Sequence, residues 1–457
     1  MHYPPVKPQT ELSSQSNWPI MSEIQTNPPF SDRAKRAVIA DSKNLMVDIL
    51  GDIWDAESNP NGYFNVGMAE NDLLHDVLLD YINTQLDLPA KYLTYNEGGA
   101  GSIRLKEAIT RFLNRHFSPA KPVQASQLAV TNGVSSAIEH LSWALASPGD
   151  GILLGRPYYG QFVPDIAMRP ETQVVPVEFG DCDPLGLTAV EKYEKTLLHW
   201  ESQTKKKVRA LLLCHPNNPL GRCYPKETIL EMMKLCTKYQ IHLISDEIYA
   251  LSTWENMIDT NPPPPKFESL LSINPDGIID PHLLHVLWGM SKDFGANGIR
   301  IGVIISQVNS DIHAALRATS IWSYISGISD HIAARILEND VFTDRYIELN
   351  RQKLQESYHF VAQYLQNHGI EYEHHGNAGF FIWVNLGKKY LENHKTSHHD
   401  GSDLTQEIMD RLLTQKVFLA SGIAFGSEQP GWFRIVVSHP TTYLTEALRR
   451  IEVAISN

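Results

Sequence analysis

Short apolar runs, each followed by a polar turn and then by a stretch with helical spacing, recur through the middle of this 457-residue chain. Such runs are typical of strands buried on both faces of a mostly parallel sheet, with helices as the connections. Functional side chains gather at the carboxyl ends of such strands. The pattern therefore predicts an α/β fold, with strands over residues 128–131, 151–155, 174–179, 208–214, 241–245, 283–287 and 299–306.

The chain is long enough for two domains, each with its own core. Residues 1–30 are rich in Pro, Ser, Gln and Asn and lack periodicity, which indicates a flexible arm or an arm that becomes ordered only against a partner subunit. Residues 31–80, whose apolar spacing is compatible with a helix over 32–50, are expected to pack with a small domain. We expect residues 81–325 to form the large domain and residues 326–457 the small C-terminal domain, because long helical stretches replace the alternation there.

The composition excludes several classes of partner. A formal charge of −13 argues against nucleic acid as the main partner. No apolar run approaches the ~20 residues that span a bilayer, and the N-terminus does not resemble a secretory signal, so we expect a cytoplasmic protein without a membrane partner. The four cysteines lack the spacing of metal ligands and fit free thiols. The histidine-rich stretch 394–403 fits a solvated loop better than a metal site.

A lysine stands just after the apolar run 283–287, at the expected mouth of the sheet. Burial of Lys292 in apolar surroundings would lower its pKa, by as much as ~3–5 units when burial is complete, and a Schiff base would remove its charge. Eight residues later, Arg300 offers a planar and permanently charged fork for a phosphate. The pair indicates an aldehyde cofactor held by its phosphate. A surface lysine after a strand is the alternative explanation of this segment alone.

Three further segments supply partners for an aromatic ring. Asp246, after the run 241–245, would pair with a ring nitrogen, and Tyr249 would donate to a ring oxygen. Asn218 lies in a turn fixed by two prolines and a glycine and is placed to reach the same oxygen. Tyr159 would stack on the ring. Taken singly, these residues could equally be a helix cap, an Asx turn and core aromatics.

A phosphate site is expected where the strand 128–131 meets a helix over 134–146. The free amides at that helix N-terminus attract anions, Gly133 allows close approach of the backbone, and Ser135 adds a hydroxyl; Val134 is expected to bind the cofactor there as well. A simple serine N-cap is the competing explanation.

Together these segments resemble, in order and placement, the fold-type I pyridoxal-phosphate enzymes, and within them the aminotransferase class I/II group that includes 1-aminocyclopropane-1-carboxylate (ACC) synthases. The resemblance implies pyridoxal 5'-phosphate as cofactor and a large domain with a mostly parallel seven-stranded sheet beside a smaller α+β domain. It implies that Lys292, Tyr249 and Asp246 are catalytic. It also implies that Tyr95 reaches the phosphate of a neighbouring subunit, so we expect a homodimer with shared active sites.

One position departs from the family pattern. The serine that commonly binds the phosphate three residues before the lysine is replaced by Gly289. We therefore expect the phosphate site to depend more on Ser135, Arg300 and Tyr95, with Ser291 as a weaker substitute.

Two segments are expected to bind the substrate. Arg434 resembles the arginine that binds the substrate α-carboxylate, which a guanidinium fork matches bidentately; a structural salt bridge is the alternative. Glu70 lies in a segment that looks like the substrate loop of the ACC-synthase-like subgroup, where a carboxylate would read a sulfonium or an amino group; a charge at a helix start is the alternative. Asn218 and Tyr159 are expected to contact the substrate as well.

The candidate reactions share the removal of the α proton by Lys292 to give a quinonoid. The leading hypothesis is an ACC-synthase-like lyase that eliminates a β or γ group or cleaves a carbon–sulfur bond in a sulfur-bearing amino acid, S-adenosylmethionine included. One alternative is an aminotransferase that uses a 2-oxo acid. Another is a non-catalytic homologue that binds a ligand without turnover.

Overall fold

The computed structural model describes residues 30–41, 45–85, 87–394 and 401–456, so the predicted arm over residues 1–30 lies almost entirely outside the described residues. The chain divides into two compact units, 1–45 and 46–457. The first contributes helix α1 (Asp32–Asp41) and the second holds all the other elements. The single helix compatible with residues 32–50 is found as two, α1 and α2 (Met46–Gly51).

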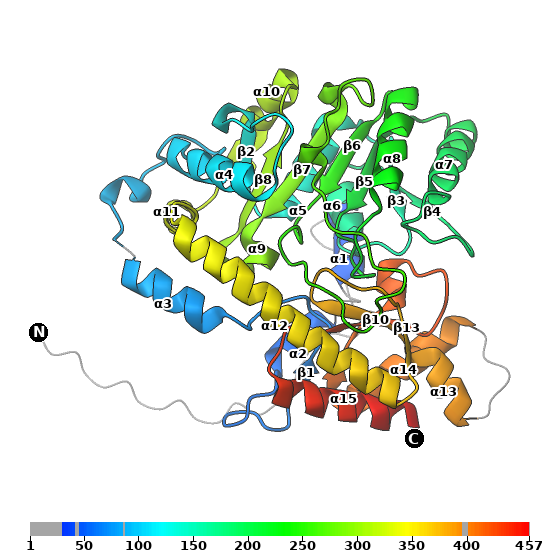
Figure 1. The fold of residues 1–457 in the computed structure, drawn as a ribbon. Helices are drawn as coiled ribbons and strands as arrows, with labels where there is room; N and C mark the ends of the chain where they lie inside the picture. Colours follow the sequence, from blue (N-terminus) through cyan, green and yellow to red (C-terminus); the bar gives the residue numbers. More distant parts are fainter. Residues whose placement is uncertain (1–29, 42–44, 86, 395–400, 457) are drawn as a thin grey trace, which may run out of the picture. The chain divides into compact units, whose positions relative to one another are not determined.

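The second unit is built on a seven-stranded sheet, and the predicted α/β fold is confirmed (Figure 1). Its order is β2-β8-β7-β6-β5-β3-β4. Strand β8 runs antiparallel to both neighbours, and the other neighbouring pairs are parallel. The strands are β2 (Leu128–Asn132), β3 (Gly151–Gly155), β4 (Gln173–Val177), β5 (Val208–Cys214), β6 (His242–Asp246), β7 (Leu284–Gly289) and β8 (Ile301–Ile305).

Helices cover both faces of this sheet, which is why its central strands carry apolar residues at consecutive positions. Leu211 and Leu243 belong to the core beneath α4, α7, α8 and α11, whereas Leu212 and Ile244 belong to the core beneath α5, α6 and α10. The helices are α4 (Ile103–His116), α5 (Val134–Leu145), α6 (Phe162–Ala167), α7 (Ala189–Thr204), α8 (Lys226–Tyr239), α9 (Met290–Asp293), α10 (Ser310–Thr319) and α11 (Gly327–Leu337).

A second, antiparallel sheet of order β12-β13-β10-β9 lies in the C-terminal part of the chain. The long helix α12 (Asp340–Asn367) precedes it, as Figure 1 shows in yellow. The strands are β9 (Glu371–Tyr372), β10 (Phe381–Asn385), β12 (Ala420–Ser421) and β13 (Trp432–Val436); the helices are α13 (Leu386–His394), α14 (Gly401–Thr414) and α15 (Thr441–Ser456).

The segment before α3 (His75–Gln85) is joined to the C-terminal part of the chain. Strand β1 (Phe64–Asn65) pairs in parallel with β11 (Val417–Phe418). The backbone N–H of Asn65 donates to the hydroxyl of Tyr443 at 2.6 Å, and that of Val436 donates to the carbonyl of Val66 at 2.7 Å. These contacts place residues 65–71 beside the second sheet, while the domain boundaries themselves stay predictions.

Two further observations concern membrane-spanning helices and the cysteines. None of the helices in the described ranges has both the length and the apolar composition needed to cross a bilayer. The four cysteines are free thiols.

Candidate active site

The predicted site residues meet at one edge of the seven-stranded sheet. Lys292 follows β7, Asp246 ends β6, Asn218 lies in the turn after β5, and Tyr159 follows β3. These strands are parallel, so their carboxyl ends share an edge. One pocket at this edge is lined by Val134, Ser135, Tyr159, Asn218, Asp246, Tyr249, Ser291, Lys292 and Arg300.

The reversed direction of β8 explains how Arg300 reaches the same edge. Because β8 is antiparallel, its first residue, Ile301, lies opposite the last residue of β2, Asn132. Gly302 correspondingly faces Gly289 at the end of β7. Arg300, which directly precedes β8, therefore lies beside the residues that directly follow β2 and β7. The expected parallel pattern did not predict this reversal.

Lys292 is half-buried, and its Nζ donates to the carbonyl of Ala69 at 2.6 Å. Burial lowers the pKa of this amine to about 8, with the charges of Arg434 and Arg300 acting in the same direction. The carboxylates of Glu70 and Asp246 oppose the shift. The site thus holds an amine that loses its proton more easily than an exposed lysine, as a Schiff-base lysine requires.

Asp246 is buried, and its Oδ1 accepts from the backbone N–H of Ile248 at 3.2 Å. Burial raises the pKa of its carboxyl to about 7, and Asp165 adds to the increase, whereas the hydrogen bond and Lys292 oppose it. A buried carboxyl of this kind gains from a cationic partner. A protonated ring nitrogen is such a partner.

Arg434 lies buried on β13 between the rings of Phe381 and Phe425, at 5.2 and 4.9 Å. Its Nη1 donates to Oδ1 of Asn218 at 2.8 Å and its Nη2 to the carbonyl of Gly67 at 2.6 Å. Its Nε is buried without a partner, and no carboxylate of the described residues forms an ion pair with it. The structural salt bridge considered for this arginine is therefore absent from the described part of the chain.

The expected phosphate site combines a helix start with the arginine fork. Gly133, with φ of +85°, precedes α5, and the guanidinium of Arg300 packs against it, where a Cβ would lie 2.1 Å from Nη2. The fork donates to the carbonyls of Asn297 at 2.8 Å and Asn132 at 3.4 Å. Ser291 is buried and lines the same pocket.

The glycine at position 289 has a steric reason. A Cβ at Gly289 would lie 2.5 Å from the carbonyl oxygen of Ile301 and 3.2 Å from side-chain atoms of Ile248 and Val134. Strand β8 therefore approaches β7 too closely for a serine, and the missing hydroxyl cannot be restored without a backbone shift.

Glu70 and Tyr95 lie outside the lining of this pocket. The carboxylate of Glu70 accepts from Nδ2 of Asn297, a lining residue, at 2.7 Å, and the hydroxyl of Ser438 donates to its backbone carbonyl. Tyr95 is 86% exposed, and the hydroxyl of Tyr324 donates to its carbonyl. The reach of Tyr95 into a neighbouring subunit stays a prediction.

Two carboxyl groups of the site were not predicted. Asp165 on α6 lines the pocket, six residues after Tyr159 in a helix too short to show periodicity. Asp293 directly follows Lys292 and is buried, and it accepts from the backbone N–H of Leu251, the hydroxyl of Ser252 and Nε1 of Trp288. An acid beside the lysine in an apolar stretch was the available signal for Asp293.

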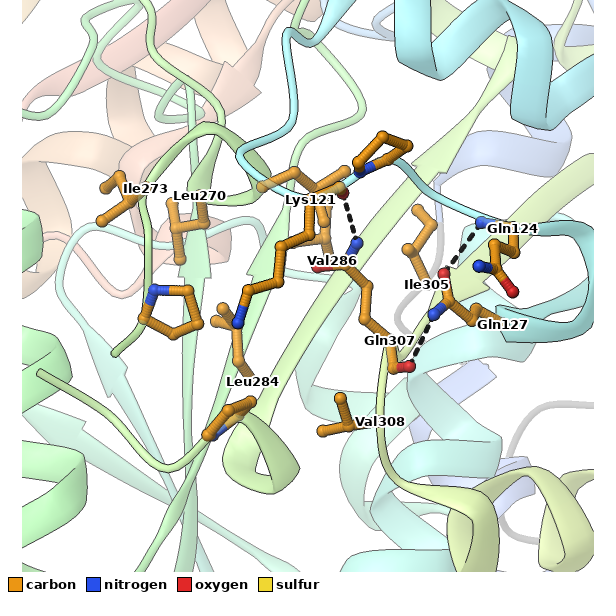
Figure 2. Close-up of a pocket in the computed structure, with 14 residues that line it drawn as sticks. Lys121, Gln124, Gln127, Leu270, Ile273, Leu284, Val286, Ile305, Gln307 and Val308 are labelled. Carbon is orange, nitrogen blue, oxygen red and sulfur yellow. Dashed lines mark hydrogen bonds between the residues drawn. The ribbon is translucent and has the colours of Figure 1, made fainter. Parts of the chain in front are cut away.

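A larger cavity, of about 290 Å³, opens at the opposite edge of the sheet, near the start of β7 and the end of β8 (Figure 2). Leu284, Val286 and Ile305 line it, and the side chains of Gln127 and Gln307 at its rim are bound to backbone carbonyls. It contains none of the predicted site residues. Across the described residues, no group of three or more His, Cys, Asp or Glu side chains is placed to hold a metal ion, and residues 395–400 lie outside them.

The residues present fit pyridoxal phosphate. Lys292 supplies the amine, Asp246 a buried carboxyl that a cation would stabilise, and Asn218 and Tyr249 polar groups in the same pocket. The anion-binding helix start and Arg300 lie in the same pocket. The individual roles of these residues remain predictions.

The chain matches known proteins over most of its length. Residues 65–451 match the model of the family described as aminotransferase class I and II. The chain is 31% identical to the 1-aminocyclopropane-1-carboxylate synthase-like protein 1 of Mus musculus over 410 residues, which are 88% of this chain and 77% of that protein. It is 31% identical over 409 residues to the probable inactive 1-aminocyclopropane-1-carboxylate synthase-like protein 2 of Mus musculus, covering 87% of this chain and 67% of that protein.

A fungal relative and a solved structure also match this chain over most of its length. The probable aminotransferase gliI of Aspergillus fumigatus is 30% identical, over 85% of this chain and 88% of that protein. A double mutant of Thermus thermophilus aspartate aminotransferase has the same fold, with a TM-score of 0.69 at 19% identity over 93% of this chain and 99% of that one. This chain therefore belongs to the aminotransferase class I and II family, and it is an enzyme whose cofactor is pyridoxal 5'-phosphate.

Proposed function

We propose that this enzyme is an ACC-synthase-like lyase that removes the α proton of a sulfur-bearing amino acid and then cleaves a carbon–sulfur bond at the β or γ position. The placement of Glu70 carries the proposal. Its carboxylate is held by Asn297 at 2.7 Å, and the carbonyl of the preceding residue, Ala69, accepts from Lys292 at 2.6 Å. A negative charge this close to the reacting amine suits a cationic substrate such as S-adenosylmethionine.

The protein groups have distinct tasks in this proposal. Arg434 binds the substrate α-carboxylate in surroundings where burial strengthens a charge-assisted bond. Lys292 takes the α proton, and its lowered pKa keeps a useful fraction of the amine neutral near neutral pH. Asp246 stabilises the proton on the ring nitrogen. The cofactor, when bound, supplies the electron sink for the carbanion at the α carbon.

The second candidate is an aminotransferase that passes the amino group to a 2-oxo acid. The 30% identity to the fungal protein named a probable aminotransferase favours it. A non-catalytic homologue is the third, since one relative is named probably inactive. The presence of Lys292 and Asp246 in one pocket, with Arg434 bound to Asn218 of that pocket, weighs against the third candidate.

We also propose that two copies of the chain share their active sites. Tyr95 is exposed and is not among the residues that line the pocket of its own chain, and large apolar side chains are exposed at Leu93, Ile321 and Trp322. A large contiguous patch of exposed apolar side chains marks a site of protein–protein contact, and these residues are the candidates for such a patch. A small-molecule amino acid remains the other expected partner.

A single experiment separates the reactions. The cofactor-loaded enzyme is mixed with S-adenosylmethionine and with cysteine conjugates in the absence of any oxo acid, and the cofactor spectrum and the products are followed together. A lyase releases a sulfur fragment over many turnovers and returns the cofactor to its starting spectrum. Arrest after one equivalent, with the cofactor aminated and one oxo acid formed, means an aminotransferase. A protein that binds these substrates without any product is the non-catalytic homologue.

A further inference from the structure

A buried asparagine of the long helix α12 contacts two segments of the active site. The Oδ1 atom of Asn350 accepts from Nδ2 of Asn71 at 2.8 Å, and its Nδ2 donates to the backbone carbonyl of Asp293 at 3.5 Å. Both asparagines are almost fully buried. Asn71 directly follows Glu70, and Asp293 directly follows Lys292. One side chain therefore connects the loop that carries Glu70 to the helix that carries the expected reacting lysine.

These two bonds belong to a closed ring of contacts. The Nζ atom of Lys292 donates to the carbonyl of Ala69 at 2.6 Å, and the backbone runs from Ala69 to Asn71. The amide pair leads from Asn71 to Asn350, and the bond to Asp293 returns the ring to the residue beside Lys292. Because the ring contains the amine itself, a shift of the loop relative to α9 changes the surroundings of Nζ.

The neighbours of Asn350 bind α12 to the catalytic segments independently of that side chain. The hydroxyl of Tyr346, one turn earlier, donates to the carbonyl of Phe294 at 2.8 Å, and the rings of these two residues are stacked at 5.3 Å. The Nε atom of Arg351 donates to the carbonyl of Leu251 at 3.0 Å. Without the amide of Asn350, the loop is therefore the part that becomes free to shift.

Other bonds limit that shift. The Nη2 atom of Arg434 donates to the carbonyl of Gly67 at 2.6 Å, and the backbone N–H of Val436 donates to the carbonyl of Val66 at 2.7 Å. An amide at Asn350 both accepts and donates without carrying a charge, whereas a leucine of similar size does neither. Loss of the amide should thus let the loop shift without opening.

The charges that face Lys292 depend on the position of the loop. Burial lowers the pKa of this amine, and Arg434 and Arg300 act in the same direction, whereas the carboxylates of Glu70 and Asp246 oppose them. Asp246 is the last residue of strand β6 and is fixed by the sheet. Of these two carboxylates, that of Glu70 is the one that moves with the loop.

We propose that Asn350 and Asn71 are a positioning pair that holds the loop in register with α9, and that thereby sets the distance from the Glu70 carboxylate to Nζ of Lys292. Neither asparagine lines the cofactor pocket. The inference rests on Lys292 being the lysine that binds the cofactor. It is independent of whether the reaction is elimination or transamination.

Hydrogen exchange of the cofactor-free protein tests the link itself. In Asn350→Leu the amides of residues 65–71 should exchange faster than in the natural protein, because the loop has lost a buried bond to α12. Thr343→Val is the matched control, since Thr343 is buried on the same helix and its hydroxyl donates to the carbonyl of Asp340 in that helix. The control should leave exchange in the loop unchanged. Unchanged exchange in Asn350→Leu, or an equal increase in the control, would overturn the inference.

A second test follows the amine. Cofactor-free protein is mixed with pyridoxal phosphate, and visible absorbance reports the rate at which the amine nitrogen replaces the aldehyde oxygen with loss of water. The pH midpoint of this rate should fall by about half a unit in Asn350→Leu, because the Glu70 carboxylate is held less closely to the amine. Asn71→Ala should give the same shift. Reaction of Lys292→Ala at the natural rate would refute the assignment of the lysine and with it the inference.

A double variant separates a shift of Glu70 from general damage. In Glu70→Gln, which lacks the charge, the addition of Asn350→Leu should not move the midpoint further, whereas damage unrelated to Glu70 would add to the effect. An unchanged midpoint in either Asn350→Leu or Asn71→Ala, measured on the folded variant, would contradict the proposal. A full additional shift in the Glu70→Gln background would contradict it as well.

Discussion

The carboxylate of Asp293 accepts a hydrogen bond of 2.7 Å from the hydroxyl of Ser252. This bond joins the short helix that carries Lys292 to the segment that follows Tyr249, and the backbone N–H of Leu251 donates to the same carboxylate. Lys292 and Tyr249, the expected reacting amine and the expected donor to the cofactor oxygen, are thus fixed relative to each other by a residue outside the lining of the pocket.

Replacement of Asp293 by Asn should therefore disturb both groups at once. One of the two oxygens that accept these bonds is lost, which costs about 1–3 kcal/mol of folding stability for buried groups left without partners. We expect a lower unfolding temperature and a lower kcat at nearly unchanged KM, measured by calorimetry and by steady-state kinetics. Asp311→Asn, an exposed residue of α10, is the matched control and should change neither. A normal kcat in Asp293→Asn would contradict the positioning role.

Arg434→Lys tests the carboxylate site while keeping the positive charge. A lysine cannot form two parallel bonds to a carboxylate, so kcat/KM should fall by about 10- to 100-fold, equivalent to the roughly 1.5–3 kcal/mol of a charge-assisted bond. The visible spectrum of the bound cofactor should be unchanged. Arg345→Gln, exposed on α12, serves as the control. Equal loss for amino acids and for the corresponding amines would show that the arginine does not read the carboxylate.

Glu70→Gln separates a cationic substrate from a neutral one. The loss of the carboxylate should raise KM for S-adenosylmethionine by about tenfold through the lost charge, with little effect on a neutral cysteine conjugate. Because Glu70 opposes the lowering of the Lys292 pKa, the pH dependence governed by this amine should move to lower pH in the variant. Both readouts come from one series of pH–rate profiles. Equal effects on the two substrates would remove the main support for the lyase proposal.

Mixed dimers test the sharing of active sites. Lys292→Ala abolishes the reacting amine, and Tyr95→Phe removes a hydroxyl that we expect to act in the partner's site. When the two variants are unfolded together and refolded, hybrid dimers should contain one complete site, so activity should exceed the sum of the separate variants. Refolding each variant alone provides the baseline. Activity equal to that sum would place Tyr95 outside the active site.

A row of histidines at the opposite edge of the large sheet predicts acid sensitivity. Nδ1 of His242 lies 3.0 Å from Nε2 of His285, and Nδ1 of His285 lies 3.1 Å from the hydroxyl of Ser306. Burial lowers the pKa of His242 to about 4 and that of His285 to about 3, with each added charge disfavouring the next.

The sign of the effect follows from proton binding. The unfolded histidines take up protons below about pH 6.5, whereas the folded ones do so only below about pH 4, so stability is complete above pH 6.5 and decreases as the pH falls from 6.5 towards 4. Urea unfolding across this range should show the decrease. His285→Asn should flatten it, and an unchanged slope in that variant would assign the acid sensitivity to other groups.

Sequence reasoning located the strands well because each is a contiguous apolar run ended by a polar turn. It found Lys292, Asp246 and Asn218 for the same reason, since each follows such a run. It did not find the reversal of β8, because a buried strand reads alike in both directions. Asp293 was missed because its hydrogen bonds are to residues distant in sequence, and Asp165 because only folding brings it into the lining of the pocket.

The reversed strand also determines how this site can change during evolution or design. Strand β7 ends and strand β8 begins at the same edge of the sheet, so Lys292, expected to bind the cofactor, and Arg300, expected to bind its phosphate, lie in a single short cassette of sequence. A substitution inside the cassette can be tolerated at one end without moving the other. An insertion or a deletion cannot be tolerated, because it would change the distance between the two side chains that are expected to hold one rigid cofactor.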